Sequence, residues 1–146
     1  MRTSITHPEL FSEVFESSTK SRLHRTITGV STDSREIKNG DLYLAIKGDR
    51  FDGHQFLDQA LLNGAVAALV CNINNEIDIQ QIRVNDTLNA IAKIANKWRM
   101  NFDIPIIGIT GSNGKTSTKE LLLHVLSSKF KTHATKGNFN TSIGLP

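Results

Sequence analysis

Apolar residues recur along the chain at two spacings, and these spacings predict which segments are helices and which are strands. Residues 8–17 carry leucine, phenylalanine and valine at helical spacing behind Pro8, a residue typical of a first helical turn. Residues 54–63 and 86–98 show a similar apolar stripe and predict two further helices. A fourth helix is expected over residues 115–128, directly after a glycine-rich loop.

Short β-branched or alternating runs lie between these helices, and we expect each run to form a strand. In the first half of the chain the candidate strands are residues 27–32, 41–47, 65–70 and 79–84. Further along, residues 104–110 are apolar and β-branched, and residues 131–135 follow the last predicted helix. Strands that alternate with helices in this way predict an α/β fold with a parallel sheet.

Two units are predicted, with a boundary near Asn85. Residues 1–84 are expected to form a small mixed α/β domain. Residues 85–146 contain the order strand, loop, helix and strand with which a parallel sheet begins. Because such a sheet normally needs more strands to cover both faces, we expect the second unit to be truncated and the chain to be a fragment of a longer one.

Composition and charge are those of an ordinary soluble globular protein, with 38% hydrophobic residues, 21% charged residues and a net charge of +3. No run of lysine and arginine is dense enough for a nucleic-acid tail, and no apolar stretch approaches the roughly 18 residues of a membrane span. The N-terminus lacks the apolar region of a signal peptide, and a single cysteine fits a reducing compartment. We expect a cytoplasmic monomer that binds no nucleic acid and does not insert into membranes.

The strongest chemical signal is a glycine-rich loop between the predicted strand 104–110 and the predicted helix after it. This is the setting that a phosphate-binding loop requires. Glycines let the backbone come close to phosphates, and the amides at the start of the helix donate to phosphate oxygens. The candidate ATP-binding residues are Gly111, Ser112, Asn113, Gly114, Lys115, Thr116 and Ser117.

Two side chains of this loop have distinct expected roles. Lys115 is the candidate catalytic residue, because its ammonium group can reach the β- and γ-phosphates. The hydroxyl of Thr116 is the candidate ligand of Mg²⁺. The loop departs from the longer phosphate-loop pattern, since Ile109 stands where that pattern has its first glycine. A glycine-rich turn with an incidental lysine is the structural alternative.

Histidine and cysteine carry no comparable signal. His54 heads a predicted helix, and we expect it to cap the helix or to pack rather than to act as a general base. The histidines have no metal-ligand spacing with one another or with Cys71, so no zinc site is predicted.

Residues 107–120 closely resemble the ATP loop of the Mur ligases, which are ATP-dependent amide-forming enzymes of peptidoglycan precursor synthesis. Upstream, residues 31–35, 39–48 and 51–54 resemble the N-terminal domain of the same family, which binds a uridine nucleotide. Two sets of motifs in the right order are more specific than either set alone. The resemblance covers nearly the whole chain.

The resemblance implies a fold and a reaction. The fold is α/β, with a small UDP-substrate-binding domain followed by the start of a P-loop parallel-sheet ATPase domain. A substrate carboxylate attacks the γ-phosphate of ATP with Mg²⁺ as cofactor, and an amine then displaces phosphate from the acyl phosphate. Residues 135–146 are similar to the member that adds D-alanyl-D-alanine (D-Ala-D-Ala) to UDP-MurNAc-tripeptide, so we expect these two small molecules as substrates.

The resemblance also implies a set of substrate-binding residues. They are Ser31, Asp33, Ser34, Arg35, Lys47, Gly48, Asn138 and Asn140. Arg35 can pair with a phosphate, but an internal salt bridge with Asp33 or Asp41 is the alternative. Asn138 and Asn140 are expected at the carboxyl edge of the sheet near substrate and metal, with a plain asparagine-rich turn as the alternative.

Several other functions remain open at this stage. A related family member adds the third amino acid of the stem peptide, and a folylpolyglutamate-type ligase shares the ATP loop but lacks the segment Asp33-Ser34-Arg35. A non-catalytic nucleotide-binding module and a P-loop GTPase or kinase are further alternatives. The family resemblance leads us to expect a later magnesium-binding glutamate, a modified lysine and a C-terminal domain. We therefore expect these 146 residues alone to lack ligase activity and to bind ATP poorly.

Overall fold

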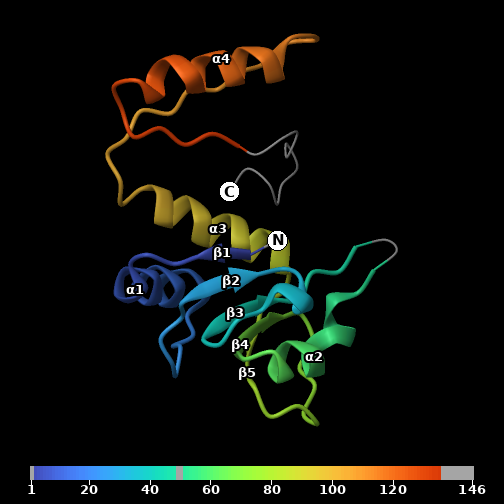
Figure 1. Cartoon of the computed structure of the whole chain (residues 1–146). Helices are drawn as coiled ribbons and strands as arrows, with labels where there is room; N and C mark the ends of the chain where they lie inside the picture. Colours follow the sequence, from blue (N-terminus) through green and yellow to red (C-terminus); the bar gives the residue numbers. More distant parts are fainter. Residues whose placement is uncertain (1, 49–50, 136–146) are drawn as a thin grey trace. The chain divides into compact units, whose positions relative to one another are not determined.

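The computed structural model describes residues 2–48 and 51–135, and the chain divides into two compact units, Met1–Asn101 and Phe102–Pro146 (Figure 1). The first unit contains a sheet with helices on both faces, whereas the described part of the second unit contains a single helix. No helix in the described residues combines the length and the apolar character needed to cross a membrane.

The first unit is built on a five-stranded sheet with the order β1-β2-β3-β4-β5 (Figure 1). Its strands are β1 (Arg2–Ser4), β2 (Gly29–Ser31), β3 (Asp41–Leu44), β4 (Ala65–Val70) and β5 (Gln80–Arg83). Strands β2 to β5 are parallel, and β1 pairs antiparallel with β2. The predicted α/β class is confirmed, and the carboxyl ends of the four parallel strands meet at one edge of the sheet.

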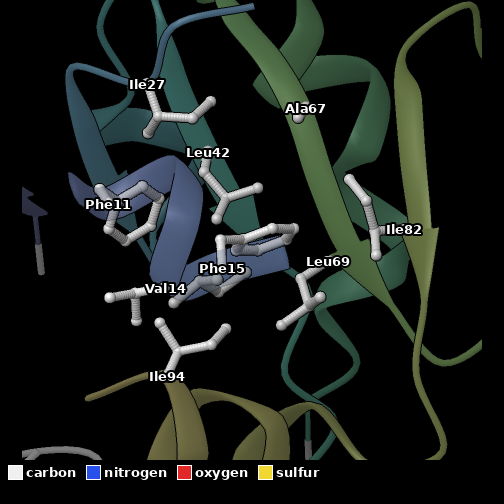
Figure 2. Packing of buried hydrophobic residues seen from close by; sticks show 10 residues of the cluster. Phe11, Val14, Phe15, Ile27, Leu42, Ala67, Leu69, Ile82 and Ile94 are labelled. Carbon is white, nitrogen blue, oxygen red and sulfur yellow. The ribbon is translucent and has the colours of Figure 1, made fainter. Parts of the chain in front are cut away.

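Helices cover both faces of this sheet. On one face, α1 (Pro8–Thr19) and α3 (Thr87–Arg99) bury Phe15 and Ile94 against Leu42 and Leu69, as Figure 2 shows. On the other face lies α2 (Leu57–Leu62), together with the short 3₁₀ helices η1 (Ser34–Glu36) and η2 (Gly53–Phe56). Each predicted helix of the first unit is therefore present, within a few residues at its ends.

The alternation of side chains along β3 and β4 explains the two cores. Leu42 and Leu44 face α1 and α3, whereas Tyr43 between them faces α2. A register shift beside the start of β3 places Ala65 in one core and Ala67 in the other (Figure 2 shows Ala67). A parallel strand that is buried on both faces needs apolar residues at every position. This explains the continuous apolar run at residues 65–70.

Helix α3 packs with the first unit. The carboxylate of Asp86 caps it by accepting a hydrogen bond from the backbone N–H of Asn89 at 2.8 Å. Near its other end, Trp98 contacts Phe11 of α1 edge to face, with ring centroids 6.0 Å apart. The sequence analysis assigned this helix to the second unit, and the packing instead groups it with the first. The functional domain boundary near residue 85 stays a prediction.

The described part of the second unit contains α4 (Lys115–Ser127), which matches the predicted fourth helix. The predicted strands 104–110 and 131–135 are wrong for this structure, because neither segment is a strand. A strand requires a hydrogen-bonded partner, and the described residues of this unit provide none. The apolar side chains of Ile106 and Ile107 are correspondingly 68% and 57% exposed.

Candidate functional site

The phosphate-binding loop forms the start of α4. Gly111 has φ +148° and Gly114 has φ +77°, and L side chains rarely adopt these conformations. A Cβ atom at Gly114 would meet nothing within 4 Å, so this position needs glycine for its backbone angle rather than for space. Gly114 precedes α4, whose first internal hydrogen bond runs from Thr118 N to Gly114 O at 2.9 Å. The amides of Lys115, Thr116 and Ser117 therefore lie in the first turn, where the helix itself offers no acceptors.

Lys115 folds back over the loop from which it starts. Its ammonium group donates to the carbonyl oxygen of Gly111, and it lies 3.4 Å from that of Ser112. Both acceptors are neutral, and phosphate oxygens form stronger, charge-assisted hydrogen bonds with lysine. The ammonium group thus already lies over the loop whose amides a phosphate would contact.

Magnesium would need oxygen ligands at this loop, and Thr116 offers one of the right kind. It is the second residue of α4, and it is exposed. Within residues 2–48 and 51–135, no three histidine, cysteine, aspartate or glutamate side chains gather as a metal site would need. The oxygen donor at this loop therefore fits a magnesium ion held mainly by nucleotide phosphates and assisted by the hydroxyl of Thr116.

The residues predicted to bind the UDP-linked substrate lie in the first unit, after β2 and β3. Two of them, Ser31 and Ser34, are buried, and their hydroxyl groups form hydrogen bonds within the protein. Ser31 is 1% exposed and its hydroxyl donates to Asp33 O at 3.0 Å. Ser34 is 6% exposed and its hydroxyl donates to Gln59 Oε1 at 2.6 Å. Their contacts show a structural role at the carboxyl edge, where they shape the turn after β2 and tie it to α2.

Arg35 forms an internal salt bridge with Asp33. Its Nε and one terminal nitrogen donate to the two carboxylate oxygens at 2.9 and 2.7 Å. Hydrogen bonds from the side chain and then from the backbone of Arg35 hold the pKa of Asp33 well below its usual range. Of the two partners considered for Arg35, Asp41 is instead bound to Arg2, at 2.6 and 2.8 Å. The Arg35 side chain is 78% exposed, so the pair is open to solvent.

Lys47 and Gly48 belong to a narrow loop that leaves β3 and returns through Asp52. Gly48 N donates to Phe51 O, and Gly53 N donates to Ile46 O, both at 2.8 Å. A Cβ atom on Gly53 would lie 2.8 Å from Ile46 N, so only glycine permits this close approach. Lys47 is 68% exposed, and its ammonium group is 3.9 Å from Asp52 Oδ2.

Tyr43 of β3 contacts the turn that follows this strand. Its side chain is fully buried, and its hydroxyl donates to Gly53 O at 2.9 Å. Burial raises the pKa of Tyr43 to about 12, and the negative charges of Asp33 and Asp52 add to the shift. The hydroxyl group thus joins β3 to the turn that follows it.

His54 also acts at this edge, through contacts that the sequence does not show. Its Nδ1 lies 2.6 Å from Asp52 Oδ1, and its Nε2 accepts a hydrogen bond from Cys71 N at 2.9 Å. The residue that caps η2 is Asp52, whose carboxylate accepts from the backbone of His54. The prediction of a capping or packing role for His54 missed this link between the turns after β3 and β4. Asn138 and Asn140 lie outside the described residues and stay predictions.

Comparison with known families agrees with this geometry. The family description "Mur ligase family, catalytic domain" matches residues 26–99, and "Mur ligase middle domain" matches residues 109–146. The first match covers β2 to α3, and the second begins just before the phosphate loop.

Individual relatives agree on one enzyme name. The UDP-N-acetylmuramoyl-tripeptide–D-alanyl-D-alanine ligases of Synechocystis sp. and Bacillus subtilis are 47% and 42% identical over 122 residues, 82% of this chain in each case. The crystal structure of MurF ligase from Thermotoga maritima in complex with ADP is 40% identical with a TM-score of 0.73, and it aligns with 80% of this chain. Crystal structure I of MurF from Acinetobacter baumannii is 33% identical with a TM-score of 0.81, over 91% of this chain.

The chain spans about a quarter of the length of these relatives, 27% for the Synechocystis, Bacillus and Thermotoga proteins and 31% for the Acinetobacter one. The family match nevertheless covers half of this chain, and it includes the sheet edge described above. The chain belongs to the Mur ligase family.

Proposed function

We propose that this chain supplies the nucleotide-sugar-binding and ATP-phosphate-binding parts of a UDP-N-acetylmuramoyl-tripeptide–D-alanyl-D-alanine ligase. The observation that carries the proposal is the glycine loop at the start of α4, in a chain whose relatives carry this enzyme name at 42–47% identity. A related structure was solved in complex with ADP, and this supports a nucleotide at the loop. The sheet edge of the first unit is the proposed site of the UDP-linked substrate.

In the proposed reaction the terminal carboxylate of the tripeptide attacks the γ-phosphate of ATP and releases ADP. The amine of D-Ala-D-Ala then attacks the acyl carbon of the acyl phosphate, and inorganic phosphate leaves as the peptide bond forms. Two anions must approach each other in the first step, so positive charge has to surround the transferring phosphoryl group.

This chain contributes to that step through the loop. The amides of the first turn of α4 bind phosphate oxygens, and Lys115 exchanges the carbonyl oxygens of Gly111 and Ser112 for phosphate oxygens. Thr116 would contribute one oxygen ligand to Mg²⁺. When bound, the ion neutralises phosphate charge during transfer.

At the sheet edge, the exposed groups are the proposed contacts for the UDP-linked substrate. Arg35, Lys47 and Gly48 are exposed, and two of them are cations suited to a diphosphate. The buried hydroxyls of Ser31 and Ser34 shape the turn that presents Arg35. Asn138 and Asn140, which lie outside the described residues, are also proposed as substrate contacts. We also propose a cytoplasmic monomer, since ATP and a UDP-linked precursor are its substrates.

The reaction can be tested by following an oxygen atom in the complete gene product. We expect heavy oxygen placed in the terminal carboxylate of the tripeptide to appear in the released phosphate, because the acyl carbon–oxygen bond is cleaved in the second step. Transfer should require both ATP and D-Ala-D-Ala. Ligation with unlabelled phosphate, or with AMP and pyrophosphate as products, would contradict an acyl phosphate intermediate.

A further inference from the structure

Both ring nitrogens of His54 are engaged, and their partners define its protonation state. Cys71 N can only donate, so Nε2 of His54 accepts and carries no proton. The single proton therefore lies on Nδ1 and is donated to Asp52 Oδ1 at 2.6 Å. The ring is neutral in this arrangement, and its side chain is 13% exposed.

These two bonds join segments that follow neighbouring parallel strands. Asp52 lies opposite Lys47 in the loop after β3, and Cys71 is the first residue after β4. The strands themselves are paired, with Leu44 beside Leu69. His54 therefore connects the two loops at the carboxyl edge, where the substrate site is proposed.

The fold of the loop after β3 does not depend on this connection. Gly53 N donates to Ile46 O at 2.8 Å, and Tyr43 donates to Gly53 O at 2.9 Å. These bonds already fasten the point where the loop returns to the sheet. The imidazole adds a constraint on the carboxylate of Asp52, which lies between His54 at 2.6 Å and the ammonium group of Lys47 at 3.9 Å.

Charge makes this constraint useful for binding an anion. Because the imidazole is neutral, the full negative charge of Asp52 remains available to orient Lys47. The ammonium group of Lys47 is 68% exposed, so it can be aimed at a ligand while it stays near the carboxylate.

We propose that His54 is a positioning residue of the nucleotide-sugar site, which holds Asp52 and thereby Lys47 in place for the diphosphate of the ligand. The proposal rests on the proposed function of the first unit. The groups in contact with the ring are the carboxylate of Asp52 and the backbone N–H of Cys71.

The test measures the binding of UDP to the 146-residue chain by titration calorimetry in magnesium-free buffer. We expect His54→Ala to weaken UDP binding about tenfold, a change that corresponds to about 1.4 kcal/mol. His54→Gln offers an amide with both an acceptor and a donor, and it should retain binding within about threefold of wild type. His24→Gln is the matched control, because His24 is an exposed histidine outside this edge, and it should bind as wild type does.

The outcomes distinguish the two proposals. If wild-type chain does not bind UDP, the proposed role of the first unit fails and the positioning role falls with it. If wild type binds UDP and both His54 variants match it in affinity, the positioning role alone is overturned.

Discussion

At the scale of single residues, Lys115 is the proposed contact between the loop and the phosphates of the nucleotide. Its ammonium group donates to the carbonyl oxygen of Gly111 and lies 3.4 Å from that of Ser112. We expect Lys115→Ala to lower kcat of the complete gene product about 10²- to 10³-fold, as loss of one preorganised charged donor does elsewhere. Lys131→Ala, which changes an exposed lysine of the same unit, should leave kcat unchanged. Equal phosphate release by wild type and Lys115→Ala would remove this lysine from the mechanism.

The ionisation of Tyr43 can be followed by a single spectroscopic signal, because it is the only tyrosine of the chain. Burial first, and then the charges of Asp33 and Asp52, raise its pKa to about 12, so the folded state favours the neutral phenol. Tyr43 makes its full contribution to the free energy of unfolding below about pH 10, the usual pKa of tyrosine. This contribution is lost as the pH rises toward about 12.

The ultraviolet absorbance of tyrosinate measures the pKa of Tyr43 directly. The folded chain should titrate near pH 12, and the chain in strong denaturant should titrate near about pH 10. Tyr43→Phe is the control, since it removes the signal. A midpoint near pH 10 in the folded chain would mean that the hydroxyl is not buried against Gly53.

Some of these residue roles could be predicted from the sequence and others could not. Glycines at Gly111 and Gly114 could be assigned from local sequence because their backbone angles are a local property. The engagement of Ser34 with Gln59, and of His54 with Cys71, depends on which strands become neighbours. For Arg35 the sequence left a phosphate contact and an internal ion pair open, and the structure shows the ion pair with Asp33.

At the scale of elements, α1 ends in an unfavourable conformation. Lys20 caps it with φ +62°, and it is the only non-glycine residue with positive φ in the described part of the chain. Lys20→Gly should raise the free energy of unfolding by about 0.5–1 kcal/mol, because glycine adopts this left-handed cap without steric cost. Lys20→Ala keeps the strain and should give no such gain.

The fluorescence of Trp98 can report the stability of the Lys20 variants, since its ring contacts Phe11 of α1. Urea unfolding followed by the fluorescence of this single tryptophan gives the free energy of unfolding for each variant. A Lys20→Gly variant no more stable than Lys20→Ala would show that the cap conformation costs nothing in solution.

Strands were predicted well where they are buried and poorly elsewhere. The run 65–70 is β4 to the residue, because a strand covered on both faces must be apolar throughout. Strand β1 was missed, since the three residues from Arg2 are polar and pair only at the edge of the sheet. The segment 104–110 has strand composition but no partner among the described residues, and composition alone cannot supply one.

At the scale of the whole molecule, the described parts of the two units differ in how many apolar side chains they bury. The first unit has two apolar cores, whereas α4 has no buried residue. An isolated helix of this length is marginal in water. We expect limited trypsin digestion to cut first near Lys129 and Lys131 and to leave the first unit intact. Mass spectrometry of the early products, compared with digestion in denaturant, measures this order. Early cleavage of the first unit at the same rate would contradict it.

We propose that this chain is part of a ligase that adds D-Ala-D-Ala. The most direct test is an amine competition with the complete gene product, ATP, Mg²⁺ and UDP-MurNAc-tripeptide, in which mass spectrometry identifies the product. We predict that the UDP-linked pentapeptide forms from D-Ala-D-Ala, and that Lys115→Ala forms it about 10²- to 10³-fold more slowly. An enzyme that instead joins a diamino acid to UDP-MurNAc-dipeptide, and leaves the tripeptide and D-Ala-D-Ala unreacted, would contradict the claim.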